Sequence, residues 1–138
     1  MSELPSSPTG VVASTISNAA VRLLNEYTGR GPTKAKTTIS GDLVVIVLGE
    51  VMTKAERSLA TNGQADVVLD MRHRFQLAMR DDLVAAVEMA TERKVIAFMS
   101  GNHIEPDTAA EIFVLEPLTD GEPVASAPQS EPAVSSSS

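Results

Sequence analysis

Three short segments of the sequence place charged or titratable side chains close enough together to do chemistry. They are residues 29–36 (GRGPTKAK), the triplet Arg72-His73-Arg74, and residues 103–107, which include His103, Glu105 and Asp107. Cations beside a glycine-proline turn can hold a phosphate or an acidic partner, and a histidine beside carboxylates can act as a general base. Each of these roles competes with a purely structural one.

The segment GRGPTKAK contains three cations and no acid. A phosphate-binding loop runs from a strand into a helix, so that backbone amides and the positive helix N-terminus meet at the anion. This segment follows a helix and precedes a strand, and a cation just past a helix C-terminus also offsets the negative end of that helix. Two roles stay open: a turn between helix and strand, or a contact for a ligand or partner. The tentative contact residues are Gly29, Arg30, Gly31, Pro32, Lys34 and Lys36.

The triplet Arg72-His73-Arg74 does not form one site, because consecutive helical positions point about 100° apart. Arg72 follows Met71 and lies four residues after Val68, next to an apolar stripe. Its stem can therefore pack on that stripe while its head meets a carboxylate. We predict a structural or interfacial ion pair for Arg72, which is also a tentative partner contact, and an exposed position for His73.

The segment 103–107 matches no metal-binding loop, since such loops need more ligands at regular spacing. A general base at His103, beside Glu105 and Asp107, stays open as an enzyme hypothesis, and the role of this loop is undecided. The chain contains no cysteine and no G-x-S-x-G motif,. We therefore expect no catalytic residue, no metal site and no cofactor.

Hydrophobic periodicity predicts the elements that carry these segments. A helix over 16–27 starts at a cap on Ser14 or Thr15 and ends at Gly29 and Pro32. A hairpin follows, with strands 35–40 and 43–48 joined by Gly41-Asp42. Thr53 and Glu56 then form a capping box for a short helix that Gly63 ends.

The second half of the chain begins with the longest predicted helix, over about 65–93. Its apolar stripe is Val67, Val68, Met71, Phe75, Met79, Leu83, Val87 and Ala90. Strands follow over 94–99 and 110–115, with a loop over 100–107 between them. The order α-ββ-α-α-ββ predicts an α+β two-layer sandwich, in which an antiparallel or mixed four-stranded sheet has its helices on one face.

The strand LVVIVL (43–48) is apolar at every position. Such a strand is typically covered on both faces or lies in an interface. A small domain offers few coverings, so the strand predicts a homodimer.

Composition limits the domain to the middle of the chain. Residues 1–10 and 118–138 are rich in serine, proline and small residues, which predicts disordered tails, the second one acidic, around a single domain over 11–117,. The longest apolar run, 43–48, is too short to cross a membrane. The absence of cysteine suits a reducing cytoplasm, and the formal charge of −7 argues against broad nucleic-acid binding,.

Several pieces of the sequence together resemble the MpsC family, the C component of a Na+-translocating membrane-potential-generating system. They are GRGP after the first helix, T-x-x-E at 53–56, RKVIAFMS, and the terminal IFVL, within a match over about 16–116. Gly29, Arg30, Gly31, Pro32, Thr53, Glu56 and Arg72 fall on motif positions. The resemblance supplies no active site. It implies a cytoplasmic accessory or regulatory protein, peripheral to a membrane cation or inorganic-carbon transport system.

The order of elements also resembles the K-homology fold, whose G-x-x-G loop clamps nucleic-acid backbone between two helices. The corresponding stretch here, Asn62-Gly63-Gln64-Ala65, has one glycine and no basic residue. A K-homology-like RNA-binding or ribosome-associated module is therefore the alternative function, although nucleic acid is not the expected partner.

Overall fold

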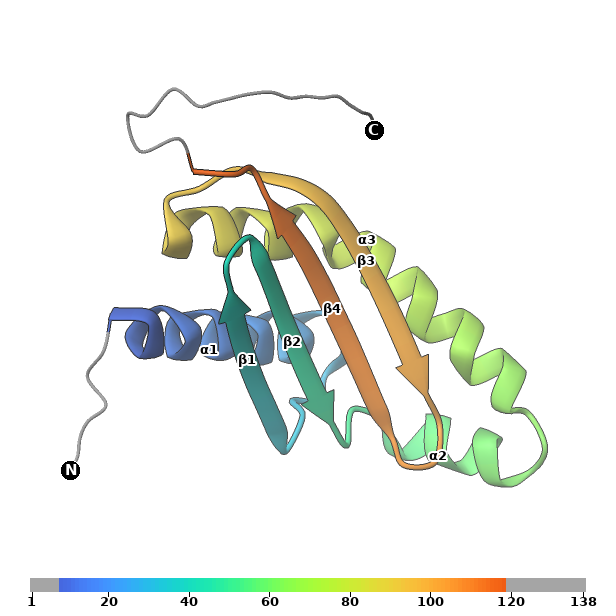
Figure 1. Cartoon of the computed structure of the whole chain (residues 1–138). Coiled ribbons are helices and arrows are strands. Elements are labelled where there is room, and N and C mark those ends of the chain that lie inside the picture. The colour runs from blue at the N-terminus through green and yellow to red at the C-terminus, as the bar shows by residue number, and fades with distance from the viewer. Residues whose placement is uncertain (1–7, 119–138) are drawn as a thin grey trace.

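An antiparallel sheet with helices packed on one of its faces makes up the structure, a computed structural model that describes residues 8–118 (Figure 1). In chain order the elements are α1 (Pro8–Thr28), β1 (Lys34–Ser40), β2 (Leu43–Gly49), α2 (Lys54–Thr61), α3 (Ala65–Thr91), β3 (Val95–His103) and β4 (Thr108–Leu115). The predicted order and the α+β class are confirmed. Helices α1 and α3 lie behind the sheet, and α2 lies at the end where β2 and β3 finish.

The four strands are arranged in the order β1-β2-β4-β3, and every neighbouring pair is antiparallel. The predicted hairpin joins β1 to β2 through Gly41, whose φ of +59° is the left-handed conformation that a tight turn requires,. The register aligns side chains in rows across the sheet, one of which runs Thr38, Val45, Ile112, Met99. Strand β4, last in sequence, therefore lies in the middle of the sheet.

Helix α1 begins earlier than the sequence predicted. It starts at Pro8, a residue that the first helical turn accepts because its missing N–H would have no partner there,. The predicted cap Thr15 lies inside the helix, where its hydroxyl donates to the carbonyl of Val11 at 3.0 Å. Residues 8–10 are thus helical although they were assigned to a tail. The remainder of both predicted tails, residues 1–7 and 119–138, lies outside the described residues.

Helix α2 has the predicted capping box. The hydroxyl of Thr53 accepts from the amide of Glu56 at 3.1 Å, and the Glu56 carboxylate accepts from the amide of Thr53 at 2.8 Å. Gly63, with φ of +81°, follows the end of the helix as expected,.

The buried side of α3 differs from the predicted stripe in its first half. The buried residues are Val68, Arg72, Gln76, Met79, Leu83 and Val87, so Arg72 and Gln76 take inward positions that were given to Met71 and Phe75. The physical reason is that the sheet presents polar groups at this end, and these pair with Arg72 and Gln76. A pattern that counts only apolar residues cannot register such a match.

Strand β3 is longer than predicted, because residues 100–103 continue the strand instead of forming a loop. Ser100, Gly101 and Asn102 are typical turn residues, but here each pairs with a residue of β4. Tertiary pairing therefore overrides local propensity, and the connection to β4 shrinks to residues 104–107.

Strand β2 has one covered face and one open face. Val44, Ile46 and Leu48 point toward the helices and are buried, with exposed fractions of 0%, 0% and 2%. Leu43 and Val47 point the other way and are exposed. The apolar run LVVIVL thus contributes alternate residues to the core and to the surface of the sheet that no helix covers.

Candidate functional site

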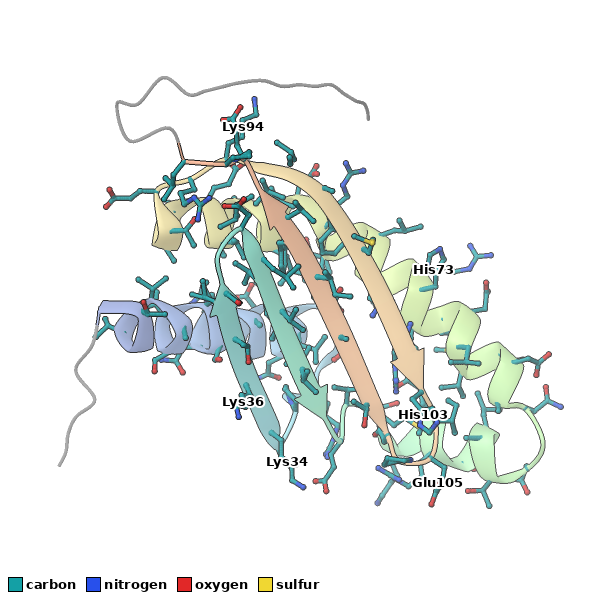
Figure 2. The ribbon with its side chains drawn as sticks, viewed as in Figure 1. Lys34, Lys36, His73, Lys94, His103 and Glu105 are labelled. Atoms are coloured by element: carbon teal, nitrogen blue, oxygen red, sulfur yellow. The ribbon has the colours of Figure 1, made fainter. Side chains whose placement is uncertain are left out.

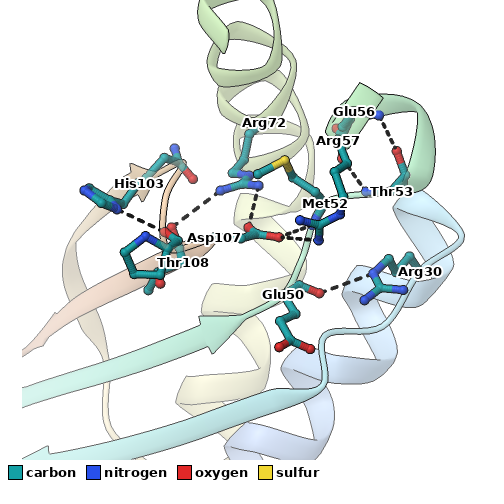
Figure 3. A network of polar contacts seen from close by, with 12 residues as sticks. Arg30, Glu50, Met52, Thr53, Glu56, Arg57, Arg72, His103, Asp107 and Thr108 are labelled. Atoms are coloured by element: carbon teal, nitrogen blue, oxygen red, sulfur yellow. Dashed lines mark hydrogen bonds and ion pairs between the residues drawn. The ribbon is translucent and has the colours of Figure 1, made fainter. Parts of the chain in front are cut away.

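A buried ion pair between α3 and β4 stands at the end of the sheet next to α2 (Figure 3). Arg72 Nη2 lies 3.0 Å from Asp107 Oδ1, and the two side chains are only 7% and 6% exposed. Arg72 Nη1 also reaches the carbonyl of Thr108 at 3.4 Å. The ion pair predicted for Arg72 is therefore present, and its partner is a carboxylate from the segment 103–107.

Asp107 joins three parts of the chain. Its carboxylate accepts from the backbone amide of Met52 at 2.8 Å, between β2 and α2, and lies 3.6 Å from Arg57 on α2. Its backbone carbonyl accepts from the amide of Glu50 at 2.9 Å. Figure 3 shows the contacts of Met52, Arg57 and Arg72 converging on the Asp107 carboxylate. Asp107 therefore fixes the entry to β4 against α2, α3 and the end of β2.

A second polar cluster lies deeper, around Glu111 in the middle of β4. Glu111 is 1% exposed, and it accepts from the hydroxyl of Ser100 and from Gln76 Nε2, the latter at 2.9 Å. Gln76 and Asn102 also form a reciprocal amide pair at 2.8 and 3.1 Å. Helix α3 is thus tied to β3 and β4 by a network in which both carboxylate oxygens have donors.

Burial raises the pKa of the Glu111 carboxyl, while the hydrogen bonds from Ser100 and Gln76 and the charge of Arg72 oppose that shift. A cavity of ≈ 20 Å³ lies beside Glu111, Arg72 and Gln76; Thr28, Glu56 and apolar side chains such as Leu48 form the rest of its wall. This volume holds about one water molecule. The cluster therefore offers a titratable group but no room for an organic substrate.

The basic turn after α1 is clamped to the end of β2. Gly29 takes φ of +80° to end the helix. Arg30 Nε donates to the carbonyl of Glu50 at 3.2 Å, and the Thr33 hydroxyl donates to the Glu50 carboxylate. The structure thus shows a helix stop and a lead-in to the strand.

The cations of the turn do not converge. Lys34 and Lys36 are exposed on β1, at one edge of the sheet, whereas Arg30 turns toward Glu50 (Figures 2 and 3). Their role as contacts for a ligand or partner stays a prediction.

The side chains of Arg72, His73 and Arg74 on α3 point in different directions, as predicted. Arg72 points inward to Asp107, whereas Arg74 pairs with Asp70 at 2.9 Å on the exposed side of the helix. His73 is exposed (Figure 2). No shared site arises from these three residues.

The segment 103–107 does not place its titratable residues in one site. Asp107 turns inward to Arg72, while His103 Nδ1 lies 3.0 Å from the carbonyl of Pro106 within its own turn. Glu105 is exposed at the tip of that turn (Figure 2). Among residues 8–118, no group of three or more His, Cys, Asp or Glu side chains is placed to hold a metal ion.

Sequence reasoning missed Glu111, Gln76, Ser100 and Asn102. One signal for Glu111 was available: it stands two residues before Phe113 in a strand, and therefore on the same face. A carboxylate on the core side of a strand needs donors, but the sequence does not reveal which residues supply them.

On the side of the sheet away from the helices, three successive rows of β2, β4 and β3 are apolar, and the next row is Gly49, Thr108 and His103. We call this surface the outer face; its residues are Leu43, Val45 and Val47 of β2, Ala110, Ile112 and Val114 of β4, and Ala97, Met99 and Gly101 of β3. Leu43, Val47 and Met99 are 41%, 44% and 49% exposed. On β1 the same side of the sheet carries Lys34, Lys36, Thr38 and Ser40. The outer face therefore has a polar margin along β1.

A family model described as MpsC, Na+-translocating membrane potential-generating system, matches residues 9–117, from the first turn of α1 to just beyond β4. The chain belongs to the MpsC family. This confirms the resemblance seen in the sequence and links the chain to a Na+-translocating membrane system. No curated protein and no solved structure matches it. Within residues 8–118 of this MpsC-family chain, none of the helices has the length and apolar character needed to span a bilayer.

The MpsC motif positions carry structural contacts in this chain. Gly29 ends α1, Thr53 and Glu56 cap α2, and Arg72 pairs with Asp107. In this chain the GRGP and T-x-x-E segments therefore lie at the junctions between helices and the sheet.

Proposed function

We propose that this MpsC-family chain is a non-catalytic cytoplasmic accessory subunit, peripheral to a Na+-translocating membrane system, and that it acts through protein contacts as a homodimer. The observation that carries the proposal is the outer face. Its apolar residues adjoin one another over three strands, beside the polar margin of β1. A contiguous exposed apolar surface with a polar rim is typical of a protein–protein contact site.

The polar clusters support an architectural role over a chemical one. The Asp107 carboxylate is held by Arg72 and the amide of Met52, and the Glu111 carboxylate is held by Ser100 and Gln76. Groups engaged in this way position elements against one another. The absence of cysteine from the sequence fits the cytoplasmic part of the proposal,.

The homodimer is tested by light scattering coupled to size exclusion over a range of loading concentrations. We expect the mass to rise above 14.5 kDa with concentration. Met99→Asp should prevent this rise, because it puts a charge into the outer face. Leu77→Asp is the matched control, since Leu77 is 56% exposed on α3 and Met99 is 49% exposed on β3. A wild-type monomer at every concentration would contradict the homodimer. Equal effects of the two substitutions would show that the homodimer does not form through the outer face.

The peripheral role is tested separately by chemical cross-linking in native cells, followed by purification of the chain and identification of the linked peptides. The proposal predicts links to an integral membrane protein of a cation-transport complex. Links confined to second copies of the chain would remove the accessory role and leave the homodimer standing.

A further inference from the structure

The side chains of the outer face differ in size, and the larger and smaller ones follow the same order in two of its three rows. In the row Leu43–Val114–Ala97, a large residue on β2 and a small one on β3 flank β4. The row Val47–Ala110–Gly101 shows the same order, and the middle row is Val45–Ile112–Met99. In these two outer rows the surface is therefore higher on β2 than on β3, where the small residues are Ala97 and Gly101. Next to Ala97 the strand has a register shift that leaves Ile96 without a partner on β4, and Ile96 is 55% exposed.

Gly101 has no role within the chain that requires a glycine. Its φ does not lie in the left-handed region, and a Cβ added there would meet no atom of residues 8–118 within 4 Å. A glycine inside a strand costs stability, and it often marks a place where another chain approaches closely. The space above Gly101 is thus free for a side chain from outside.

Two copies related by a two-fold axis can pack the large residues of one outer face against the small residues of the other. When two such faces stack with the axis parallel to the strands over β4, each β4 lies on the other β4, and β2 of each copy lies on β3 of the other. Because the axis runs along the strands, each row of one copy lies over the same row of the other copy. Large residues then meet small ones: Leu43 lies over Ala97, and Val47 lies over Gly101.

The other two-fold axis in the plane of the faces, perpendicular to the strands, fits poorly. It would lay β2 on β2 and β3 on β3, so that Leu43 would face Val47 and Ala97 would face Gly101. Two large residues would then collide on one side of β4, and two small ones would leave a void on the other side. Both outcomes cost stability in a packed interface.

We propose that two copies of this chain stack their outer faces about a two-fold axis parallel to the strands, with Val47 of each copy seated over Gly101 of the other. This arrangement rests on the homodimer proposed above. It leaves β1 outside the stack, so Lys34 and Lys36 remain in solvent. The apolar strands β2, β4 and β3 then gain the cover that the helices give to their inner side.

The stack is small for a stable interface. Three strands about 4.8 Å apart and about 24 Å long give a footprint of about 340 Å² on each copy. Stable specific interfaces bury about 800 Å² per partner, and smaller ones belong to weak or transient complexes. The homodimer should therefore dissociate on dilution.

The first test replaces the glycine at position 101 with a larger residue. Gly101→Val adds bulk that the single chain accommodates but that meets Val47 of the second copy, so we expect the dissociation constant to rise at least tenfold. Adding Val47→Ala to the same chain should recover much of the loss. Ser40→Val is the matched control, because it adds bulk on the same side of the sheet, on β1, outside the stack.

The outcome is read by sedimentation velocity, with circular dichroism to verify the fold of each variant. Weakening by Gly101→Val and recovery by Val47→Ala support the arrangement. An unchanged dissociation constant for Gly101→Val, or a loss as large for Ser40→Val, overturns it.

The second test uses the fact that the chain has no cysteine. Single variants Val45→Cys and Met99→Cys are oxidised separately and as a mixture; a disulfide can bridge two packed sheets when its residues face each other. The arrangement predicts a covalent dimer in the mixture, linked from position 45 to position 99, and little from either variant alone. Self-linked dimers of each variant would identify the perpendicular axis instead.

Failure of the arrangement and failure of the homodimer give different results. A wild-type chain that dimerises without the 45–99 link refutes only the arrangement. A wild-type chain that stays monomeric at all concentrations refutes both.

Discussion

Arg72 on α3 and Asp107 at the start of β4 form an ion pair of 3.0 Å that is almost withdrawn from water. The same carboxylate receives the amide of Met52 and lies near Arg57. One pair of side chains therefore holds together the long helix, the short helix and the middle strand of the sheet.

Asp107→Ala should lower the free energy of unfolding by about 3–5 kcal/mol, because it leaves the charge of Arg72 buried without its partner. Urea denaturation monitored by circular dichroism measures this change. Asp70→Ala breaks an ion pair of similar length, 2.9 Å, on the exposed side of α3, and it should leave stability nearly unchanged. If the two variants lose similar amounts of free energy of unfolding, the buried ion pair of Asp107 stabilises the fold no more than the exposed pair of Asp70.

Glu111→Gln should alter how stability depends on pH. Burial raises the pKa of Glu111 in the folded state, so the folded chain binds this proton more tightly than the unfolded chain. Its stabilising contribution is then complete below the unfolded pKa and is lost as the pH rises through the raised, folded pKa. A neutral glutamine can still accept from Gln76 and donate to Ser100.

The free energy of unfolding of the variant minus that of the wild type should therefore increase as the pH rises from 4 to 8. Urea denaturation of both chains at several pH values tests this. A difference that does not change with pH would show that Glu111 does not titrate as described.

Thr53→Ala should cost about 1 kcal/mol, within a range of about 0.5–2 kcal/mol, because it removes the side-chain acceptor at the start of α2. Thermal and urea unfolding give the value. Ser58→Ala, in the same helix and away from its start, is the comparison and should be neutral or slightly stabilising. If the two substitutions behave alike, the capping box contributes nothing measurable.

The alternative function, a K-homology-like RNA binder, makes a separate prediction. A backbone-phosphate binder loses affinity as salt rises, in proportion to the phosphates it contacts. Since Arg30 is turned to Glu50 while Lys34 and Lys36 stand apart from it, we expect negligible binding of mixed RNA in a low-salt filter titration. If RNA binds, the binding weakens with salt, and charge reversal of these three residues abolishes it, the RNA-binding function would be favoured.

Much of the fold was readable from the sequence because its signals are local. The glycines at 41 and 63 mark turns, and Thr53 with Glu56 marks a helix start. The uninterrupted apolarity of 43–48 predicted a strand that is covered on both faces or lies in an interface. The structure shows the helices on one side and the outer face on the other.

The parts that were missed depend on contacts between distant residues. Gln76 is buried because it meets Asn102 and Glu111, and Ser100 is in a strand because it pairs with β4. No window of neighbouring residues contains that information. The same holds for Gly101, whose position opposite Ala110 emerges only from the register.

Sedimentation equilibrium of the wild-type chain across a wide concentration range tests whether the outer face binds a second copy of the chain. The outer face as a contact for a second copy predicts a reversible shift from 14.5 kDa toward twice that mass, and Met99→Asp should hold the chain at the lower value. A wild-type chain that remains at 14.5 kDa at every concentration would show that the outer face does not bind a second copy.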